Sequence, residues 1–261
     1  MKNKPRSIFN YVLRLTYVAI LPVVTSFTLV FTIYANQAKD NTTQTSAIPL
    51  IEAKKCRLAN YMIKFDLLHG ESNVGKATRE LKQANKHSDV HLLSSLTASM
   101  AFVKFIQKER SVMKDYIDTG FYSSEFSKYV KKPFKKEIKQ IYTIDALDSN
   151  NGLTLLDPLS VYDHLRELAC SGLKANITLN VQEEKEVTQY HFEYKGEETL
   201  QLPMGEAQTI FFVRTRKTST RETSIWFNIN QYFLPVKIQQ EKDGDTQAVL
   251  VAKSIDAALL R

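Results

Sequence analysis

Glycine and cysteine are both scarce in this chain, with 8 glycines and 2 cysteines among 261 residues. No glycine-rich loop that could cradle a phosphate group occurs, which excludes nucleotide chemistry of that kind. The sequence offers no four-ligand set for structural zinc, and no Gly-x-Ser-x-Gly elbow that would present a hydrolase nucleophile. The chain is therefore predicted not to be an enzyme and to use neither a cofactor nor a metal.

The letters of a hydrolase triad do occur within two helical turns, at Asp157, Ser160, Asp163 and His164. They lack the strained turn that exposes a nucleophile, so we interpret Asp157 as a helix cap and Ser160 as a polar residue of the first turn. His87 and His91 stand four residues apart, which suits a metal only on a helix, and their polar neighbours predict a loop. Neither group predicts a reaction centre.

The N-terminal segment indicates where the protein is located. A charge-free, mostly apolar stretch from Tyr17 to Ala35 follows a positive head of Lys2, Lys4, Arg6 and Arg14. This arrangement targets a chain to the inner membrane and leaves the bulk of the chain in the periplasm. The stretch fits either a signal peptide (residues 1–35) removed after Ala35 or a signal anchor over residues 17–35. Residues 36–56 are rich in polar side chains and are expected to form a flexible tether.

The net charge gives little reason to expect a nucleic-acid partner. The formal charge of the whole chain is +7, and removal of the four positive residues of the leader lowers it to +3. Much of the remaining positive charge is local, in Lys128, Lys131, Lys132, Lys135, Lys136 and Lys139. These lysines are expected either to solvate an edge strand and its loop or to form a patch that touches anionic headgroups.

Residues 57–256 are predicted to form one domain of antiparallel strands. Tyr190, Phe192 and Tyr194 alternate with polar residues up to Gly196, which is the pattern of a half-buried strand that ends at a turn residue. The dipeptide Asp243–Gly244 is the strongest short-range indication of a hairpin. Further strands are predicted at 61–67, 77–81, 91–105 (which also fits a helix), 109–116, 136–144, 207–216, 223–229, 236–241 and 246–255.

One helix is predicted among these strands. Asp157 can cap its first turn, Pro158 suits the first helical position, and Gly172 stands where a left-handed C-terminal residue is expected. A single short helix among many strands predicts one large curved antiparallel sheet, a half-barrel or open barrel that the helix plugs or lies beside. That shape is similar to the half-barrels of periplasmic lipoprotein carriers of the Lol type.

A string of short motifs runs through this domain. Its members are Tyr61 to Gly75, Asp157 with Leu159 and Ser160, Tyr194 with Gly196 and Glu198, Leu202 to Gly205, Trp226 with Phe227, Leu234 to Lys237, and Asp243 with Gly244. In order and spacing these motifs resemble the bacterial domain-of-unknown-function family 3108 over most of the chain after residue 57. The resemblance implies an exported envelope protein of mainly antiparallel β structure with no established activity, and it supplies no catalytic residue.

Cys56 and Cys170 are the two cysteines. Outside the cytoplasm such a pair can form a disulfide, which here would join the start of the domain to the C-terminal end of the helix. A disulfide requires Cα atoms within roughly 7 Å, a separation that the sequence does not fix. The paired and the unpaired states therefore both stay open.

Trp226, the single tryptophan, has two interpretations. It can be a core aromatic residue that donates its indole N–H to a neighbour. Alternatively it lines the mouth of the half-barrel, where Arg214, Arg216 and Arg221 hold the acidic end of an amphiphile. The second interpretation predicts a ligand-binding site.

Two functions therefore stay open for the exported domain. The first is non-catalytic binding of an apolar or lipid-like ligand inside the curved sheet. The second is a periplasmic interaction module that docks on an envelope protein partner through a sheet edge or the basic patch. A continuous internal cavity would favour the first function, and a filled interior with an exposed apolar patch would favour the second.

Overall fold

The computed structural model describes residues 56–83, 89–100, 103–114, 122–144, 147–148, 153–216 and 219–259. The predicted leader (1–35), residues 36–55 of the predicted tether, and His87 lie outside these ranges. Among the helices formed by the described residues, none combines the length and the apolar character needed to cross a membrane.

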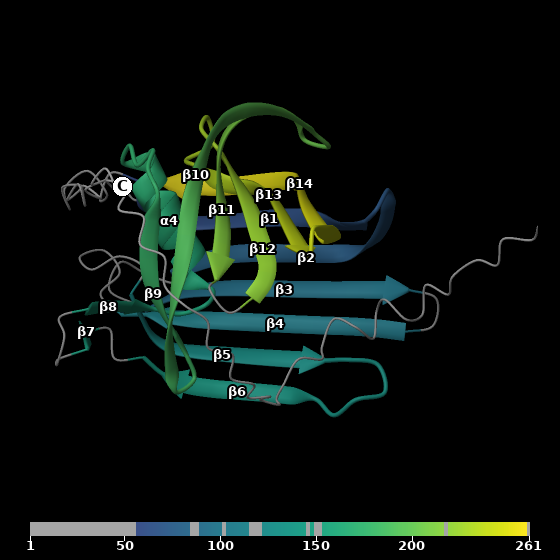
Figure 1. Cartoon of the computed structure of the whole chain (residues 1–261), viewed down its shortest axis with the longest axis vertical. Coiled ribbons are helices and arrows are strands. Elements are labelled where there is room, and N and C mark those ends of the chain that lie inside the picture. Colours follow the sequence, from purple (N-terminus) through teal and green to yellow (C-terminus); the bar gives the residue numbers. More distant parts are fainter. Residues whose placement is uncertain are drawn as a thin grey trace, which may run out of the picture. The chain divides into compact units, whose positions relative to one another are not determined.

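The described residues form a mainly β domain with one helix (Figure 1). The helix is α4 (Ser160–Cys170), which connects β8 to β9. The strands are β1 (Leu58–His69), β2 (Ser72–Gln83), β3 (Val90–Met100), β4 (Val103–Met113), β5 (Ser123–Lys131), β6 (Ile138–Thr143), β7 (Leu147–Asp148), β8 (Leu153–Leu156), β9 (Ile177–Glu183), β10 (Glu186–Leu202), β11 (Gly205–Arg216), β12 (Ser219–Asn228), β13 (Leu234–Lys242) and β14 (Asp245–Leu259).

All strands belong to one sheet in the order β6-β5-β4-β3-β2-β1-β14-β13-β12-β11-β10-β9-β8-β7. Neighbours pair antiparallel except β8 and β9, which run parallel because the α4 crossover connects them. The first and last strands of the domain, β1 and β14, pair in the middle of the sheet. The prediction of one large, mainly antiparallel sheet with a single helix is confirmed for the described residues.

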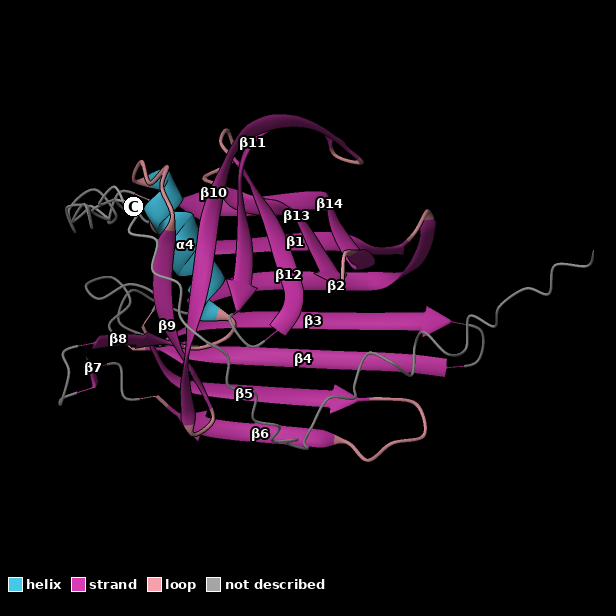
Figure 2. Ribbon diagram, viewed as in Figure 1, coloured by secondary structure: helices cyan, strands magenta, loops and turns pink. Residues whose placement is uncertain are grey.

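The sheet bends so strongly that strands near its two ends meet. In Figure 2, strands β9 to β12 run steeply across strands β1 to β6. The Tyr142 hydroxyl of β6 donates to the Gln182 carbonyl of β9 at 3.0 Å, and the Gln182 side chain donates to the Thr143 carbonyl at 3.1 Å. These contacts involve side chains, and among the described strands β6 and β9 form no backbone ladder. The sheet is therefore curved and open.

Helix α4 lies between the two layers of this bent sheet. Asp163 of the helix contacts Arg79 of β2, and the Tyr162 ring meets Phe192 of β10 edge to face at 6.1 Å. Two clusters of buried apolar residues surround it, one centred on β1 to β3 and the other on β9 to β12. The helix therefore fills space between the layers, as the single-helix pattern predicted.

Local sequence chemistry accounts for the ends of α4 and for the last hairpin. The Asp157 carboxylate accepts hydrogen bonds from the Leu159 and Ser160 amides, so it caps the first turn. Gly172 has φ +99°, and its amide donates to the Ala169 carbonyl, which ends the helix in a left-handed residue. Asp243 and Gly244 have φ of 54° and 82°, as a two-residue hairpin turn with primed geometry requires. All three predictions are confirmed.

Several predicted strand limits are wrong. Gly196 does not end a strand: β10 continues to Leu202, and Gly196, with φ +114°, sits at a β-bulge. The predicted strand 91–105 covers parts of two strands, β3 and β4, which pair as a hairpin. The predicted strand 109–116 begins and ends too far along the chain, because β4 runs from Val103 to Met113. Strand β9 was not predicted, because its alternation is irregular in a polar stretch.

Candidate functional site

Buried charges surround α4 and are paired with one another. Asp163 is fully buried and accepts hydrogen bonds from the Tyr61 hydroxyl and from Arg79 Nε, the latter at 2.8 Å. Arg79 also donates to the Leu159 carbonyl at 2.8 Å. Burial, followed by the charge of Asp163, raises the pKa of Tyr61 well above its usual value, so its hydroxyl stays protonated and donates. This set of contacts ties β1 and β2 to the helix.

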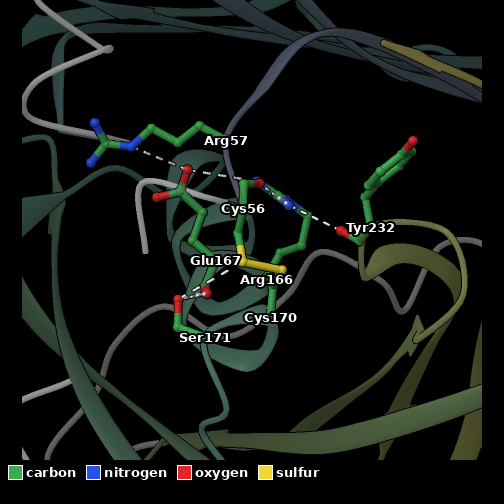
Figure 3. Close-up of a disulfide and its surroundings, with 7 residues drawn as sticks. All are labelled: Cys56, Arg57, Arg166, Glu167, Cys170, Ser171 and Tyr232. Atoms are coloured by element: carbon green, nitrogen blue, oxygen red, sulfur yellow. Dashed lines mark hydrogen bonds and ion pairs between the residues drawn. A yellow bond between two sulfur atoms is a disulfide. The ribbon is translucent and has the colours of Figure 1, made fainter. Parts of the chain in front are cut away.

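A second buried group joins the helix to the start of β1 (Figure 3). Arg166 donates to the carbonyls of Cys56 at 2.9 Å and Tyr232 at 3.0 Å, and lies 3.6 Å from the Glu167 carboxylate. Arg57 reaches the same carboxylate at 3.6 Å. Every one of these charges has an opposite charge or a carbonyl beside it, which is what stable burial requires. We therefore interpret these residues as structural.

Cys56 and Cys170 form a disulfide in the same region, with their Cα atoms 6.0 Å apart and 114 residues between them in sequence. The Ser171 hydroxyl, next to Cys170, donates to the Glu167 carbonyl at 2.8 Å. The disulfide and the Arg166 contacts together fix the C-terminal end of α4 to the chain that enters β1. The structure thus brings together the two cysteines whose pairing the sequence left open.

Asp157, Ser160, Asp163 and His164, the residue types of a hydrolase triad, have structural contacts. Asp157 and Ser160 form hydrogen bonds with each other at the start of α4. Asp157 caps α4 and accepts a hydrogen bond from Ser111 Oγ at 2.8 Å, while Asp163 belongs to the buried charges around Arg79. His164 faces the Tyr122 ring at 5.7 Å, and loss of hydration, followed by the charge of Arg57, lowers its pKa to about 4. Each residue therefore serves the fold through contacts of its own.

Arg214 of β11 lies in an aromatic environment on the helix side of the sheet. It is 8% exposed, and its guanidinium carbon lies 4.6 Å from the Tyr190 ring centroid and 5.7 Å from that of Tyr162. Its Nη2 atom donates to Thr223 Oγ1 on β12 at 2.9 Å. Helix α4 and strands β10 to β12 thus all contribute to its surroundings.

Arg216, two residues further along β11, also contacts Tyr190. Its guanidinium carbon lies 4.5 Å from the Tyr190 ring centroid, and it donates to the Tyr190 hydroxyl at 2.6 Å. Glu183 of β9 pairs with Arg216 at 3.0 Å and accepts a hydrogen bond from the Tyr190 hydroxyl. Burial is the main cause that raises the pKa of Tyr190, so this phenol remains a donor at neutral pH. We call Tyr162, Glu183, Tyr190, Arg214 and Arg216 the arginine–tyrosine cluster.

The two arginines of this cluster differ in their counter-charges. Arg216 has Glu183, whereas Arg214 forms no ion pair with any carboxylate of the described residues. The Nε atoms of both arginines are buried without a hydrogen-bond partner in that part of the chain, so the counter-charge is what sets Arg214 apart. A buried cation without an opposite charge is costly, and cation–π contacts of about 0.5–2 kcal/mol compensate it only in part. Arg214 is therefore the group best placed to receive an anion from outside the chain.

Trp226 does not belong to this cluster. It stacks on Phe211 with ring centroids 5.2 Å apart, and its indole N–H donates to the Glu198 carboxylate. Phe211 and Arg214 are three residues apart on β11, so they point to opposite faces of the sheet. The predicted site with Trp226 beside Arg214 and Arg216 is therefore not formed, and Trp226 is a buried aromatic residue with the Lys237 ammonium 4.2 Å from its ring.

Arg221, the third predicted arginine, is exposed near the start of β12. It is on the same face as Thr223, because the two residues are two positions apart along the strand. Its charge contributes to a lowered pKa of Lys132, a smaller cause than partial burial and the charges of Lys135 and Lys128. Arg221 therefore extends the positive region near Arg214 toward the loop between β5 and β6.

Sequence reasoning found Arg214 and Arg216 but missed the aromatic and acidic partners. Tyr190 was predicted to alternate in a strand and Tyr162 to lie on a helix, but their meeting depends on the bend of the sheet. Glu183 was missed with strand β9. The spacing of Tyr190 and Phe192 does indicate that both side chains lie on one face of β10. The structure adds that Phe192 pairs with Arg214, which places all three side chains on the same face of the sheet.

A shallow groove of about 310 Å³ lies elsewhere, over the outer face of β1, β2 and β14. Tyr61 and Leu81 contribute to it, but their side chains are buried on the inner side, while Asn60 and Lys82 are exposed. Its lining consists of Asn60, Tyr61, Met62, Glu80, Leu81, Lys82, Asp256, Ala257 and Ala258. The groove includes no member of the arginine–tyrosine cluster and is not the internal cavity that would favour a ligand inside the sheet.

A family model described as "Protein of unknown function (DUF3108)" matches residues 119–251 of the chain. The match runs from just before β5 into β14 and includes the helix and the arginine–tyrosine cluster. The β1–β2 hairpin, which carries the upstream part of the resemblance, lies before the matched residues. Among curated proteins, none matches the chain.

Two solved structures match most of this chain at low sequence identity. One is a beta-barrel-like protein of domain of unknown function DUF1849 from Brucella abortus, with 10% identity and a TM-score of 0.47 over 77% of this chain and 98% of that one. The other is a protein with a YmcC-like fold from Bacteroides fragilis, with 10% identity and a TM-score of 0.32 over 75% of this chain and 95% of that one. Neither likeness carries an argument about function.

Proposed function

This chain belongs to the DUF3108 family, proteins of unknown function, and from that premise we propose a non-catalytic binding role in the cell envelope. The ligand is an anionic amphiphile. Its acidic group is held by Arg214 and Arg216, and its apolar part lies against the aromatic side chains on the helix side of the curved sheet. The charge of Arg214, buried with no carboxylate of the described residues beside it, is the observation that carries this proposal.

The chemistry of the arginine–tyrosine cluster supports an anionic ligand. A guanidinium group donates two parallel hydrogen bonds to a carboxylate or phosphate, and such charge-assisted bonds are stronger than neutral ones. Arg214 Nε is buried without an acceptor among the described residues, so an acid group would satisfy it. The Tyr190 hydroxyl already donates to Glu183, which leaves the arginines as the groups that receive the anion.

The neighbouring side chains support an apolar tail. Phe212 is two positions from Arg214 on β11, and Phe192 of β10 pairs with Arg214. Both phenylalanines therefore lie on the face that carries Arg214, and both are buried. The rings of Tyr162 and Tyr190 contact the Arg214 guanidinium itself. A ligand with one acidic end and one apolar end would match this order of side chains, and its tail requires Phe192 and Phe212, which are 1% and 0% exposed, to move apart and admit it.

Export to the periplasm is also a proposal, and two features support it. The N-terminal segment has the positive head and apolar stretch of a leader or anchor. The bond between Cys56 and Cys170 suits an oxidising compartment, since disulfides rarely persist in the cytosol.

Titration with two labelled amphiphiles tests the binding proposal. The full chain, held in a neutral detergent, is titrated with a dansyl-labelled fatty acid and with the same molecule carrying an alcohol in place of the acid. We expect the acid to bind at least about tenfold more tightly, the value of one charge-assisted hydrogen bond. Arg214→Met should remove that preference, whereas Arg110→Met, at an exposed arginine of β4, should retain it. Equal binding of acid and alcohol by the native protein would contradict the proposal.

A second candidate function, docking through a sheet edge, is favoured by the exposure of β6. This strand is one end of the sheet, and its Ile141 side chain is 74% exposed. The test is a pull-down of an envelope protein with the native chain and two variants. Loss of that protein with Ile141→Lys but not with Arg214→Met would favour this second function over ligand binding.

A further inference from the structure

The loop between β5 and β6 presents an exposed aromatic residue among lysines. Phe134 is 93% exposed at this turn and has φ 58°. It follows Lys132 and Pro133 and precedes Lys135 and Lys136. Phenylalanine is usually buried, so its position at the tip of a charged turn calls for a partner.

The charge around Phe134 is strongly positive. Residues 131–139 contain five lysines and one glutamate, a formal charge of +4, and Glu137 lies 3.3 Å from Lys131. Partial burial and then the charges of Lys135, Lys128 and Arg221 lower the pKa of Lys132, as expected where cations crowd together. An anionic surface would relieve this repulsion.

Apolar side chains continue from the turn along the edge strand. Ile141 is 74% exposed on β6, on the same face as Lys139 by alternation, whereas Ile138, 42% exposed at the start of the strand, points to the opposite face. Single exposed apolar residues are common on protein surfaces, but here three lie within eight residues that also carry lysines. The combination of apolar and basic side chains is typical of segments that rest on a membrane surface.

We propose that the β5–β6 hairpin docks on the surface of an anionic phospholipid bilayer, with Phe134 among the acyl chains and the lysines at the headgroup phosphates. A bilayer suits a protruding tip because it needs no complementary pocket, and its negative surface matches the charge of the loop. This inference does not depend on the ligand proposed for Arg214.

A fluorescent probe in the loop tests this docking in the full chain. Phe134→Trp places an indole at the tip, while Trp226, at 6% exposure, gives a constant background that is measured in the native protein. The protein is added to vesicles of neutral phosphatidylcholine, or of phosphatidylcholine with phosphatidylglycerol, each made with brominated acyl chains that quench indole. We expect quenching of the Phe134→Trp probe in the anionic vesicles and at least about fivefold less in neutral ones, since each lysine contributes about a factor of five.

Matched variants separate docking from a membrane contact made by the N-terminal segment. Tyr232→Trp places the same probe in the turn between β12 and β13 and should show no lipid-dependent quenching. Adding Lys135→Gln and Lys136→Gln to Phe134→Trp should lose most of the quenching, and adding Arg214→Met should leave it unchanged. Equal quenching in neutral and anionic vesicles, or equal quenching of both probes, would overturn the proposal.

Discussion

Replacement of Arg214 by methionine should distinguish a binding residue from a structural one. Methionine keeps an apolar stem of similar length for contact with Tyr162 and Tyr190 but removes the charge. The matched variant is Arg79→Met, because both arginines are buried but only Arg79 has a carboxylate partner among the described residues, Asp163. The two substitutions therefore make the same chemical change in different electrostatic surroundings.

The expected free-energy changes differ in size. Arg79→Met removes the nearest cation of the fully buried Asp163, which keeps only the Tyr61 hydroxyl and Arg166 Nε at 3.8 Å, and should lower the free energy of unfolding by about 3–5 kcal/mol. Arg214→Met loses one hydrogen bond to Thr223 and two cation–π contacts, together about 2–4 kcal/mol. It also removes a desolvation penalty of several kcal/mol for a buried charge, so we expect its stability to stay within about 1 kcal/mol of the native value.

Urea unfolding of the full chain in a neutral detergent, followed by far-ultraviolet circular dichroism with the disulfide intact, measures both values. Native protein, Arg79→Met and Arg214→Met are compared at pH 7 in the absence of added amphiphile. If Arg214→Met lost as much stability as Arg79→Met, the protein itself would be supplying the counter-charge. Arg214 would then be structural, and the reasoning that assigns it to a ligand would be refuted.

Three further predictions concern stability. Burial lowers the pKa of His164 from 6.5 to about 4, so between these pH values the unfolded chain binds a proton that the folded chain does not. The free energy of unfolding should therefore fall by up to about 3 kcal/mol from pH 6.5 to pH 4. In a pH series of urea midpoints, His164→Gln should flatten this part of the curve. Replacement of both Cys56 and Cys170 by serine should cost about 2–5 kcal/mol in the same assay, and an unchanged midpoint would mean that the bond does not form in the purified protein. A Cβ on Gly75 would lie 2.1 Å from the Thr97 carbonyl of β3, so Gly75→Ala should cost about 3 kcal/mol or more because the backbone has to shift. Gly70→Ala, in open space but at φ +59°, should cost about 1–2 kcal/mol.

Features that depend on a few neighbouring residues were predictable from the sequence. Asp157 and Gly172 mark the ends of the helix through local hydrogen bonds and a positive φ, and Asp243–Gly244 fixes a turn by its own backbone preference. The alternating apolar residues of β1 identified a half-buried strand in the same way. Such signals require no knowledge of where the rest of the chain lies.

Features that depend on distant residues were not predictable. Arg79 and Asp163 are 84 residues apart in sequence, and only the bend of the sheet around α4 brings them together. Alternation places Phe211 and Arg214 on opposite faces of β11, but it does not show that Trp226 of the next strand pairs with Phe211 and therefore faces away from Arg214. The bulge at Gly196 looks like the end of a strand, because glycine serves both purposes. The arginines of the candidate site were therefore found from the sequence, while their aromatic partners were not.

Native mass spectrometry of the full chain, purified from its own membranes in a neutral detergent, tests the proposed function most directly. The account predicts that the native protein carries one bound anionic lipid and that Arg214→Met, purified in the same way, carries none. A native protein free of lipid, or the same lipid on both proteins, would contradict the assignment of Arg214 as the group that receives the ligand.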